Sequence, residues 1–397
     1  MRTAFCVVIG AGAAGISAAI SCRRKGGDVL ILERLSKPGK KILASGGGRC
    51  NLLNDNLSAE KYNAEARELT ASVIARYGKA RLIEHFKGLG LEVYSDEGRI
   101  FPVTNQSASV LSVLELELAR LAVPIEFNFE VAAITRKGDG YSVVSADNTA
   151  IDCRKVIIAG GGKSYPALGS NGSCYRLARA LGHSIVDPIP SCVAVLSRDK
   201  LCHHLQGQRI TCRATAMAGD VPAASAGGEL IFTQYGLSGT AVLDVSTALS
   251  VALHRQGKKE ADLRIDLVPF MSVEALETEL TWRVAAGAKP EELLIGILPN
   301  KFGPAMADML RSRSPAKIAR AVKDRRFDVT GTRGWNEAEF TSGGVTCAEV
   351  EPVNLESKVA RGVHLCGEVL DVNGERGGYN LAWAWASGLL AGEAASS

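Results

Sequence analysis

The apolar positions at the start of the chain form two short uninterrupted runs, at residues 5–9 and 29–32. Runs of this length without polar alternation are typical of strands buried on both faces of a parallel sheet. Between them, small residues from 13 to about 25 follow a helical pattern that ends at Gly26-Gly27. The pattern therefore predicts a strand–helix–strand unit of the kind that builds α/β folds.

Periodicity also predicts the elements that follow this unit. Amphipathic helices are expected at 66–88 and 107–121, and a final helix is expected to open after 376–380 and run to about 388. Short runs separated by Gly, Asp and Asn turns predict a small antiparallel meander, and two apolar runs that end in glycine predict buried strands. The expected strands of these two groups cover 131–134, 141–144, 150–153, 155–162 and 363–368.

The pattern changes character between residues 191 and 340. Short β-rich pieces alternate with turns up to about residue 267, and a helical pattern follows from 272 to about 326. We therefore predict that 1–190 and 341–397 form one α/β dinucleotide-binding domain and that 191–340 form a domain inserted into it. A chain of 397 residues is long for a single core, which agrees with more than one domain.

The turn between the first strand and the first helix has the sequence Gly10-Ala11-Gly12-Ala13-Ala14-Gly15. In a G-x-G-x-x-G turn the first glycine makes the tight turn, the second lets the backbone approach a pyrophosphate, and the third lets the helix pack closely on the strand. Glu33 ends the second strand, where a carboxylate accepts hydrogen bonds from an adenosine ribose and disfavours a 2′-phosphate. The sequence thus predicts a dinucleotide site, with a glycine-rich turn that binds nothing as the alternative.

Two further glycine-rich segments bear on which dinucleotide is bound. Ser45-Gly46-Gly47-Gly48-Arg49-Cys50-Asn51 follows soon after the second strand and could approach the far half of a long cofactor, which favours FAD. Arg376-Gly377-Gly378-Tyr379-Asn380 opens the last helix, whose N-terminal N–H groups suit negative charge on a reduced flavin. The alternatives are a flexible surface loop for the first segment and a packing helix for the second.

Composition narrows the class of protein only a little. The net charge of +4 is too mild to indicate an acidic partner, and ten cysteines without a C-x-x-C pair indicate free thiols in a reducing compartment. We therefore expect a cytoplasmic protein without a metal site or disulfide. Glycines 10, 12 and 15 interrupt the N-terminal apolar run, so we expect neither a secretory signal nor a membrane span.

Motifs along the whole chain carry a resemblance to a known family. Beside the segments already named, they are Gly98-Arg99-Ile100-Phe101-Pro102, Ser164-Tyr165-Pro166, 232–239, 341–345 and 367–371. On these motifs the chain resembles the BaiN/YhiN-type FAD-dependent oxidoreductases, which include NAD(P)/FAD-dependent and aminoacetone-oxidase-like flavoproteins. The resemblance implies a Rossmann-like FAD-binding domain of the two-dinucleotide-binding-domain type, with a β-barrel-like insert that carries a helical subdomain.

The resemblance also implies where FAD is bound. It places the pyrophosphate at Gly12–Gly15, the adenosine ribose at Glu33, the ribityl chain near Glu368, and the isoalloxazine near 46–51 and 378–380. The residues that it assigns to the cofactor are Gly10, Gly12, Ala13, Ala14, Gly15, Glu33, Arg34, Lys41, Ser45, Gly46, Gly47, Gly48, Arg49, Asn51, Val131, Ala159, Gly160, Gly161, Gly367, Glu368, Gly378, Tyr379, Asn380 and Leu381.

Candidate catalytic residues lie in the second glycine-rich loop. Cys50 is a candidate proton donor, with a structural thiol as the equal alternative, and Arg49 could hold an anionic substrate or the flavin. Gln234 and Thr240 stand where many relatives carry His and Pro, so a mechanism that uses this histidine as a base is not expected. Because only one G-x-G-x-x-G is present, NAD(P)H is expected at most as a transient electron donor.

The first hypothesis for function is hydride transfer between flavin N5 and an unsaturated C=C or C=N bond of a small molecule. Three alternatives remain open: a dihydrouridine synthase acting on ribosomal RNA, an amine oxidase of the aminoacetone type, and a non-catalytic flavin-bound sensor. RNA would be contacted through a basic helix at 311–326, for which a solvated helix face is the alternative. The basic residues of this segment are Arg311, Arg313, Lys317, Arg320, Lys323, Arg325 and Arg326. The sequence does not predict the oligomeric state.

Overall fold

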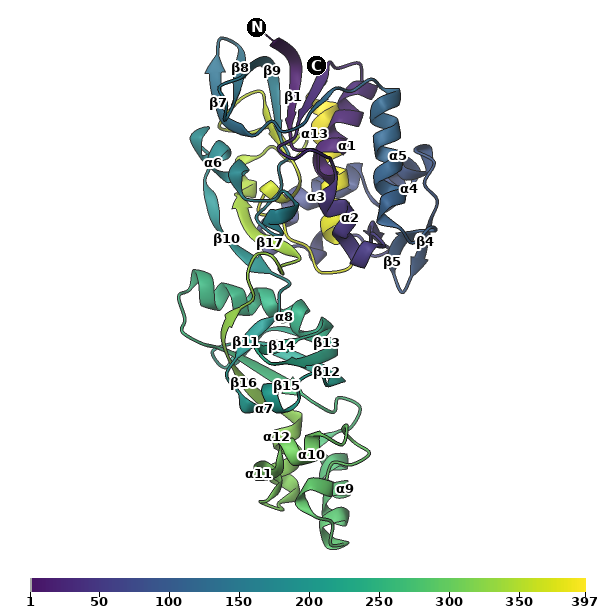
Figure 1. Ribbon diagram of the computed structural model, residues 1–397, viewed down its shortest axis with the longest axis vertical. Helices are drawn as coiled ribbons and strands as arrows, with labels where there is room; N and C mark the ends of the chain where they lie inside the picture. Colours follow the sequence, from purple (N-terminus) through teal and green to yellow (C-terminus); the bar gives the residue numbers. More distant parts are fainter. Residues whose placement is uncertain (1) are drawn as a thin grey trace. The chain divides into compact units, whose positions relative to one another are not determined.

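The computed structural model describes residues 2–397 and divides into two compact units (Figure 1). Unit 1 comprises Met1–Pro188 and Phe340–Ser397, and unit 2 comprises Ile189–Glu339. The chain leaves unit 1 along β10 (Ile185–Ser191) and returns along β17 (Phe340–Val345), and these two strands pair with each other. Unit 2 is thus inserted between two segments of unit 1.

Unit 1 is built on a seven-stranded sheet in the order β6-β2-β1-β9-β8-β7, with β18 also paired to β9. Strands β6, β2, β1, β9 and β18 are parallel to one another, whereas β8 pairs antiparallel with both β9 and β7. The strands are β1 Arg2–Ile9, β2 Val29–Leu32, β6 Ile125–Glu126, β7 Val131–Lys137, β8 Gly140–Ser145, β9 Ala150–Ile158 and β18 Val363–Leu365. The sheet confirms the predicted Rossmann-like α/β fold, since all four residues of β2 are buried, as expected for a strand covered on both faces.

Strand β9 is one continuous element where the sequence predicted two. Its first half, residues 150–153, pairs antiparallel with β8, and its second half, residues 156–158, pairs parallel with β18. Arg154 and Lys155 lie where the neighbouring strand changes, and β1 pairs with β9 through this point. The polar pair therefore marks a change of neighbour and not the end of a strand.

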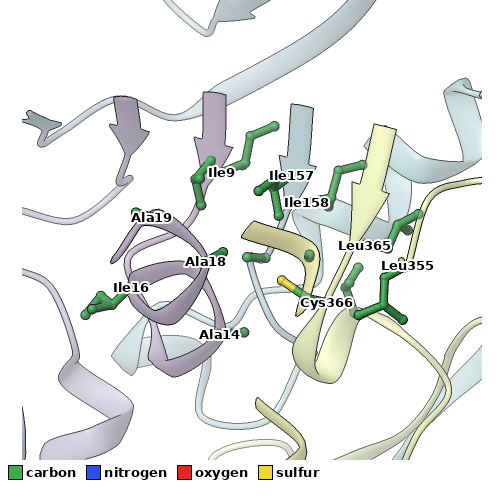
Figure 2. Packing of buried hydrophobic residues seen from close by; sticks show 14 of the residues in the cluster. Ile9, Ala14, Ile16, Ala18, Ala19, Ile157, Ile158, Leu355, Leu365 and Cys366 are labelled. Atoms are coloured by element: carbon green, nitrogen blue, oxygen red, sulfur yellow. The ribbon is translucent and has the colours of Figure 1, made fainter. Parts of the chain in front are cut away.

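Helices α1 (Ala13–Arg24) and α13 (Tyr379–Ala394) come from opposite ends of the chain and pack together, as Figure 1 shows. Figure 2 shows α1 against the strands of the sheet, with Ala14 and Ala18 among the buried side chains. A Cβ on Gly388 would overlap the Ala14 carbonyl oxygen, and one on Gly392 would overlap that of Ala18. Glycines four residues apart on α13 thus allow the two backbones to approach closely.

The helix predicted at 66–88 is two helices, α3 (Arg67–Arg76) and α4 (Lys79–Gly88). They are separated because Gly78 starts α4 in an extended conformation, and a Cβ there would lie 2.8 Å from the Ile74 carbonyl oxygen. Helix α5 (Ser107–Arg120) agrees with the predicted 107–121.

Unit 1 also contains several shorter helices and strands. Strands β3, β5 and β4 form a separate three-stranded sheet in that order. These elements are α2 Lys40–Ala44, the 3-10 helix η1 Ser45–Gly48, β3 Leu53–Asn54, η2 Ala59–Lys61, η3 Ala64–Ala66, β4 Val93–Asp96, β5 Arg99–Pro102, η4 Pro166–Leu168, α6 Ser173–Ala180, η7 Cys347–Glu349 and η8 Gly367–Val369.

Unit 2 contains a closed six-stranded barrel in the order β11-β14-β13-β12-β15-β16. The strands are β11 Val195–Ser197, β12 Arg209–Ala218, β13 Val221–Thr233, β14 Gly236–Ser238, β15 Ala261–Asp266 and β16 Arg325–Thr332. Apolar and polar residues alternate along β15, whose buried side chains Ala261, Leu263 and Ile265 face the core. The barrel confirms the expectation of a β-barrel-like insert.

The helical part of unit 2 is more broken than the predicted helical stretch at 272–326. Pro290, Pro299, Pro304 and Pro315 punctuate it, and proline ends or begins helices. The helices of unit 2 are α7 Lys200–His204, α8 Thr240–Ser250 with a π-helical turn at Val251–Arg255, α9 Val273–Ala285, η6 Pro290–Glu292, α10 Phe302–Ala305, α11 Ala307–Leu310 and α12 Pro315–Lys323. Among residues 2–397, no helix has both the length and the apolar character that crossing a membrane requires.

Candidate functional site

The adenosine end of the predicted site lies where β1 and β2 end. The turn of residues 10–15 joins β1 to α1, and Glu33 directly follows β2. The Ala11 N–H donates to Glu33 Oε2 at 2.7 Å, and the Leu35 N–H donates to Oε1 at 2.8 Å. These bonds fix the carboxylate beside the glycine turn. The structure therefore brings together the two features from which the sequence predicted a dinucleotide site.

The three glycines of this turn differ in what surrounds them. A Cβ on Gly15 would overlap the Gly10 carbonyl oxygen and lie 3.3 Å from Val8 Cγ1, so α1 packs on β1 too closely for any side chain. A Cβ on Gly10, whose φ is +104°, would lie 2.9 Å from the Ala159 carbonyl oxygen. A Cβ on Gly12 would meet nothing within 4 Å. Packing thus explains Gly10 and Gly15, whereas the open space at Gly12 suits a pyrophosphate at a helix N-terminus.

Three other residues assigned to the cofactor are packed against or bonded to the protein itself. The Arg34 guanidinium donates to the Gly169 carbonyl oxygen at 3.1 Å, and Val131 is buried at the start of β7. A Cβ on Gly160 would overlap Cys174 Sγ of α6. We therefore expect these positions to contribute shape and backbone groups rather than side-chain hydrogen bonds.

Glu368 lies at the centre of a polar cluster that joins the two segments of unit 1. Its Oε2 pairs with Lys41 Nζ at 2.8 Å and accepts from the Gly162 N–H at 3.3 Å. Its Oε1 accepts from the Thr341 N–H at 2.7 Å and from the Ser164 hydroxyl at 3.2 Å. The structure thus brings the predicted residues Lys41 and Glu368 together. It adds Gly162, Ser164 and Thr341, which the sequence indicated only as parts of motifs or of an expected strand.

The second glycine-rich loop has an unusual backbone and one unmet hydrogen-bond acceptor. Gly46, Gly47, Gly48 and Cys50 all have φ between +56° and +90°, a region that favours glycine. Asn51 follows them, and its buried Oδ1 has no hydrogen-bond partner among the described residues. An acceptor of this kind is costly unless a ligand or water donates to it. The loop therefore presents a polar atom to which a ligand N–H could donate.

The start of α13 lies against this loop. A Cβ on Gly378 would lie 2.8 Å from Asn51 Oδ1, so the two segments touch. The side chain of Asn380 is held by its own loop, because it accepts from the Gly374 N–H at 2.9 Å and donates to the Gly374 carbonyl at 3.0 Å. Tyr379 is buried, and its carbonyl accepts from the Tyr62 hydroxyl at 2.8 Å. Contacts from this segment to a flavin would come from backbone N–H groups at the helix start.

The Cys50 thiol lies in the core and not on the loop surface. Its side chain is fully buried, and burial raises the pKa of the thiol to about 11. A group that solvent does not reach is poorly placed to give a proton to a substrate. Of the two sequence-based interpretations of Cys50, this geometry favours the structural thiol.

The Arg49 side chain, in contrast to that of Cys50, is partly exposed to solvent. Its side chain is 44% exposed, its guanidinium lies 4.2 Å from the centroid of the Phe101 ring, and it donates hydrogen bonds to Tyr94 and Asn105. Tyr94 and Phe101 belong to the β4–β5 hairpin. The sequence indicated Phe101 only as part of a motif. Tyr94 and Asn105 lie 45 and 56 residues from Arg49, so no local pattern links them to it.

The basic segment at 311–326 is not one helix, and unit 2 neutralises much of its charge. Helix α12 ends at Lys323, and Arg325 and Arg326 belong to β16. Lys323 pairs with Asp266, and the partners of the flanking arginines are Asp308 for Arg311, Asp199 for Arg325, and Asp262 and Asp328 for Arg326. On α12, Lys317 and Arg320 are exposed and have no ion-pair partner among residues 2–397. Gln234 is exposed in the turn between β13 and β14.

The fold and this site define a class of protein. A glycine turn with Glu33 beside it, a second glycine-rich loop and a glycine-led helix, on a Rossmann-like sheet, define a flavoprotein oxidoreductase. The chain belongs to the HI0933-like Rossmann family, whose model matches residues 4–394. It is therefore an enzyme and not a non-catalytic flavin-bound sensor.

Three curated relatives align along nearly their whole length. The 3-dehydro-bile acid delta(4,6)-reductase of Clostridium scindens is 38% identical over 98% of both chains. The ribosomal RNA dihydrouridine synthase of Haemophilus influenzae is 29% identical over 96% of both chains. The enzyme of the same name from Escherichia coli is 28% identical over 96% of this chain and 95% of its own.

Solved structures share the fold at low sequence identity. A flavocytochrome c3 fumarate reductase matches with a TM-score of 0.54 and 14% identity, covering 100% of this chain and 78% of that one. The 3-ketosteroid-delta4-(5alpha)-dehydrogenase of Rhodococcus jostii matches with a TM-score of 0.51 and 17% identity, covering 100% and 97%.

Proposed function

We propose that this enzyme uses FAD to reduce an electron-poor C=C or C=N bond of a small molecule. The observation that carries the proposal is the unmet Asn51 Oδ1 acceptor beside Gly378, in a loop that also leaves open space at Gly47 and Gly48. The imide N–H of a flavin ring is a donor that suits this acceptor. The name of the relative at 38% identity, a 3-dehydro-bile acid delta(4,6)-reductase, supports the choice of reaction.

Two groups of residues would hold the two ends of the cofactor. The glycine turn and Glu33 would hold the pyrophosphate and ribose, while Asn51 and the first backbone N–H groups of α13 would hold the flavin edge. Bound FAD would supply the hydride, and the protein supplies orientation and charge stabilisation. The N-terminus of α13 would stabilise negative charge on that edge.

Anaerobic stopped-flow reduction of the FAD-loaded protein by NADH and by NADPH tests this proposal. Rapid reduction followed by reoxidation with a conjugated enone, and slow reoxidation by oxygen, is the expected result. Failure of both nicotinamides, with rapid reaction of the chemically reduced protein with oxygen, would refute it and favour the amine oxidase. Steady peroxide formation with aminoacetone would then identify that oxidase.

A second candidate is dihydrouridine synthesis in ribosomal RNA. The names of the relatives at 29% and 28% identity favour it, and the exposed side chains of Lys317 and Arg320 provide unpaired positive charge. Binding to phosphates through such residues falls steeply with salt. Filter binding of unmodified ribosomal RNA at salt concentrations from about 50 to about 200 mM tests this candidate, because affinity that depends on phosphate contacts falls steeply over that range. RNA affinity that is unaffected by exchanging both residues for Gln would count against this route.

A further inference from the structure

Arg49 is held in one orientation by three neighbours from the β4–β5 hairpin and the residues that follow it. Its Nε donates to Asn105 Oδ1 at 3.0 Å, and its Nη2 donates to the Tyr94 hydroxyl at 2.9 Å. The Tyr94 hydroxyl in turn donates to Asn105 Oδ1 at 2.7 Å, which closes a ring of three hydrogen bonds. The Phe101 ring lies beneath the guanidinium. We call Arg49, Tyr94, Phe101 and Asn105 the arginine clamp.

The arginine clamp fixes one edge of the guanidinium and leaves the other free. Nη1 has no hydrogen-bond partner among residues 2–397, and the side chain stays 44% exposed. Asp96 Oδ2 lies 3.8 Å from Nη2, but this carboxylate is itself 53% exposed, so the pair is weak and screened. Because neighbours already hold the guanidinium, little side-chain entropy remains to be lost when an anion binds.

The arginine clamp is attached to the loop that we assign to the flavin. Arg49 directly follows Gly48, and β3, which pairs with β5 of the hairpin, contacts the start of α13. Asn54 Nδ2 of β3 donates to the Gly377 carbonyl at 2.9 Å, and a Cβ on Gly378 would overlap the Leu53 carbonyl oxygen. A ligand held by Arg49 would therefore lie beside the proposed flavin edge.

We propose that Arg49 binds a carboxylate of the substrate and that Tyr94, Phe101 and Asn105 are positioning residues for it. The inference rests on the proposed function, since it concerns the substrate of that same site. A guanidinium binds a carboxylate through parallel N–H bonds, which a neutral amide or ester cannot accept with equal strength. The substrate class is thus an unsaturated carboxylic acid.

Calorimetric titration of the oxidised FAD-loaded protein with trans-cinnamate and with cinnamamide tests the inference without turnover. The two probes share a planar unsaturated skeleton and differ in charge. We expect cinnamate to bind about tenfold more tightly, because a charge-assisted bond contributes more than a neutral one. Arg49→Gln should remove this preference, and Tyr94→Phe should reduce it while leaving cinnamamide affinity unchanged.

Three results would overturn the inference: wild-type protein without a preference for cinnamate, a preference that survives Arg49→Gln, or a loss of FAD affinity in that variant. FAD affinity is measured separately by fluorescence, because a lost cofactor would show that Arg49 holds the flavin. Arg81→Gln is the matched control, since Arg81 also lies over an aromatic ring, 5.0 Å from the centroid of Tyr77. If the protein reduces enones but binds both probes equally, only this inference is refuted. If it selects cinnamate through Arg49 but reduces no unsaturated bond, the proposed function is refuted.

Discussion

The substitutions Gly12→Ala and Gly15→Ala make the same chemical change three residues apart. We expect the first to weaken cofactor binding and the second to destabilise the fold. A Cβ at Gly12 meets nothing within 4 Å and would project into the space that we assign to the pyrophosphate. A Cβ at Gly15 would overlap the Gly10 carbonyl oxygen and lie 3.0 Å from its carbon, where ordinary contacts begin at 3.4 Å. Gly12→Ala should therefore impair the cofactor site, and Gly15→Ala the fold.

The expected magnitudes follow from these surroundings. Gly12 is the N-cap of α1 with φ −87°, which any residue adopts, so a small capping loss is offset by reduced entropy of the unfolded chain, and the net change is within about 0.5 kcal/mol. At Gly15 the helix must move away from β1, and overpacking of this kind costs about 3 kcal/mol. In a domain of this size that lowers the melting temperature by roughly 6–12 °C.

Thermal unfolding of both apo variants, followed by FAD titration of the tryptophan and flavin fluorescence, separates the two effects. We expect Gly12→Ala to unfold like the wild type and to bind FAD at least about tenfold more weakly, the factor that corresponds to about 1.4 kcal/mol. Normal FAD affinity in this variant would refute the placement of the pyrophosphate at the glycine turn. A Gly15→Ala protein as stable as the wild type would refute the packing argument.

Burial lowers the pKa of His85 to about 4, so the unfolded chain takes up a proton at a higher pH than the folded protein does. The wild type should therefore lose about 2 kcal/mol of unfolding free energy as the pH falls from 6.5 to 4, and His85→Leu should reduce this loss in urea unfolding. Ser357→Ala should cost about 1–2 kcal/mol in the same assay, because the Ser357 hydroxyl and its hydrogen-bond partner His183 Nε2, 2.9 Å away, are both buried. Glu33→Gln should weaken FAD binding about tenfold in fluorescence titrations, since the carboxylate that faces the turn loses its charge. Cys50→Ala should leave kcat within about threefold from pH 7 to 9, where a thiol with a pKa of about 11 is protonated; a much larger loss would restore its role as proton donor.

The elements that could be predicted from the sequence are those whose signal is local. The β1–α1–β2 unit is set by apolar runs, small helical residues and the glycine turn, all within residues 2–33. The predictions that were wrong concern elements decided by distant neighbours or by single breaks. β9 continues through Arg154 because β1 pairs along it, and Gly78 separates α3 from α4 although the apolar period continues. Local periodicity carries no information about either.

The candidate site divides in the same way. The glycine turn and Glu33 could be found because their spacing of 18 residues, from Gly15 to Glu33, is a property of the β–α–β unit itself. The arginine clamp could not, since Tyr94 and Asn105 approach Arg49 only through the pairing of β3, β4 and β5. Its one sequence signal is the set of aromatic and polar residues around the 98–102 motif, which has no fixed spacing to the loop.

The packing of α1 on α13 links the two ends of the proposed cofactor site. α1 begins at the glycine turn, and α13 begins at Gly378 beside Asn51, so the close approach that Gly388 and Gly392 allow fixes the separation of these two starts. Glu368, from the second segment, is held by Lys41 from the first. Residues 2–188 alone would contain the pyrophosphate end but lack β18, Glu368 and the helix start that faces Asn51. Retention of FAD should therefore require both segments of unit 1, residues up to 188 and residues from 340 onward, to be folded together. Cofactor binding is then a measure of the folding of the whole interrupted domain.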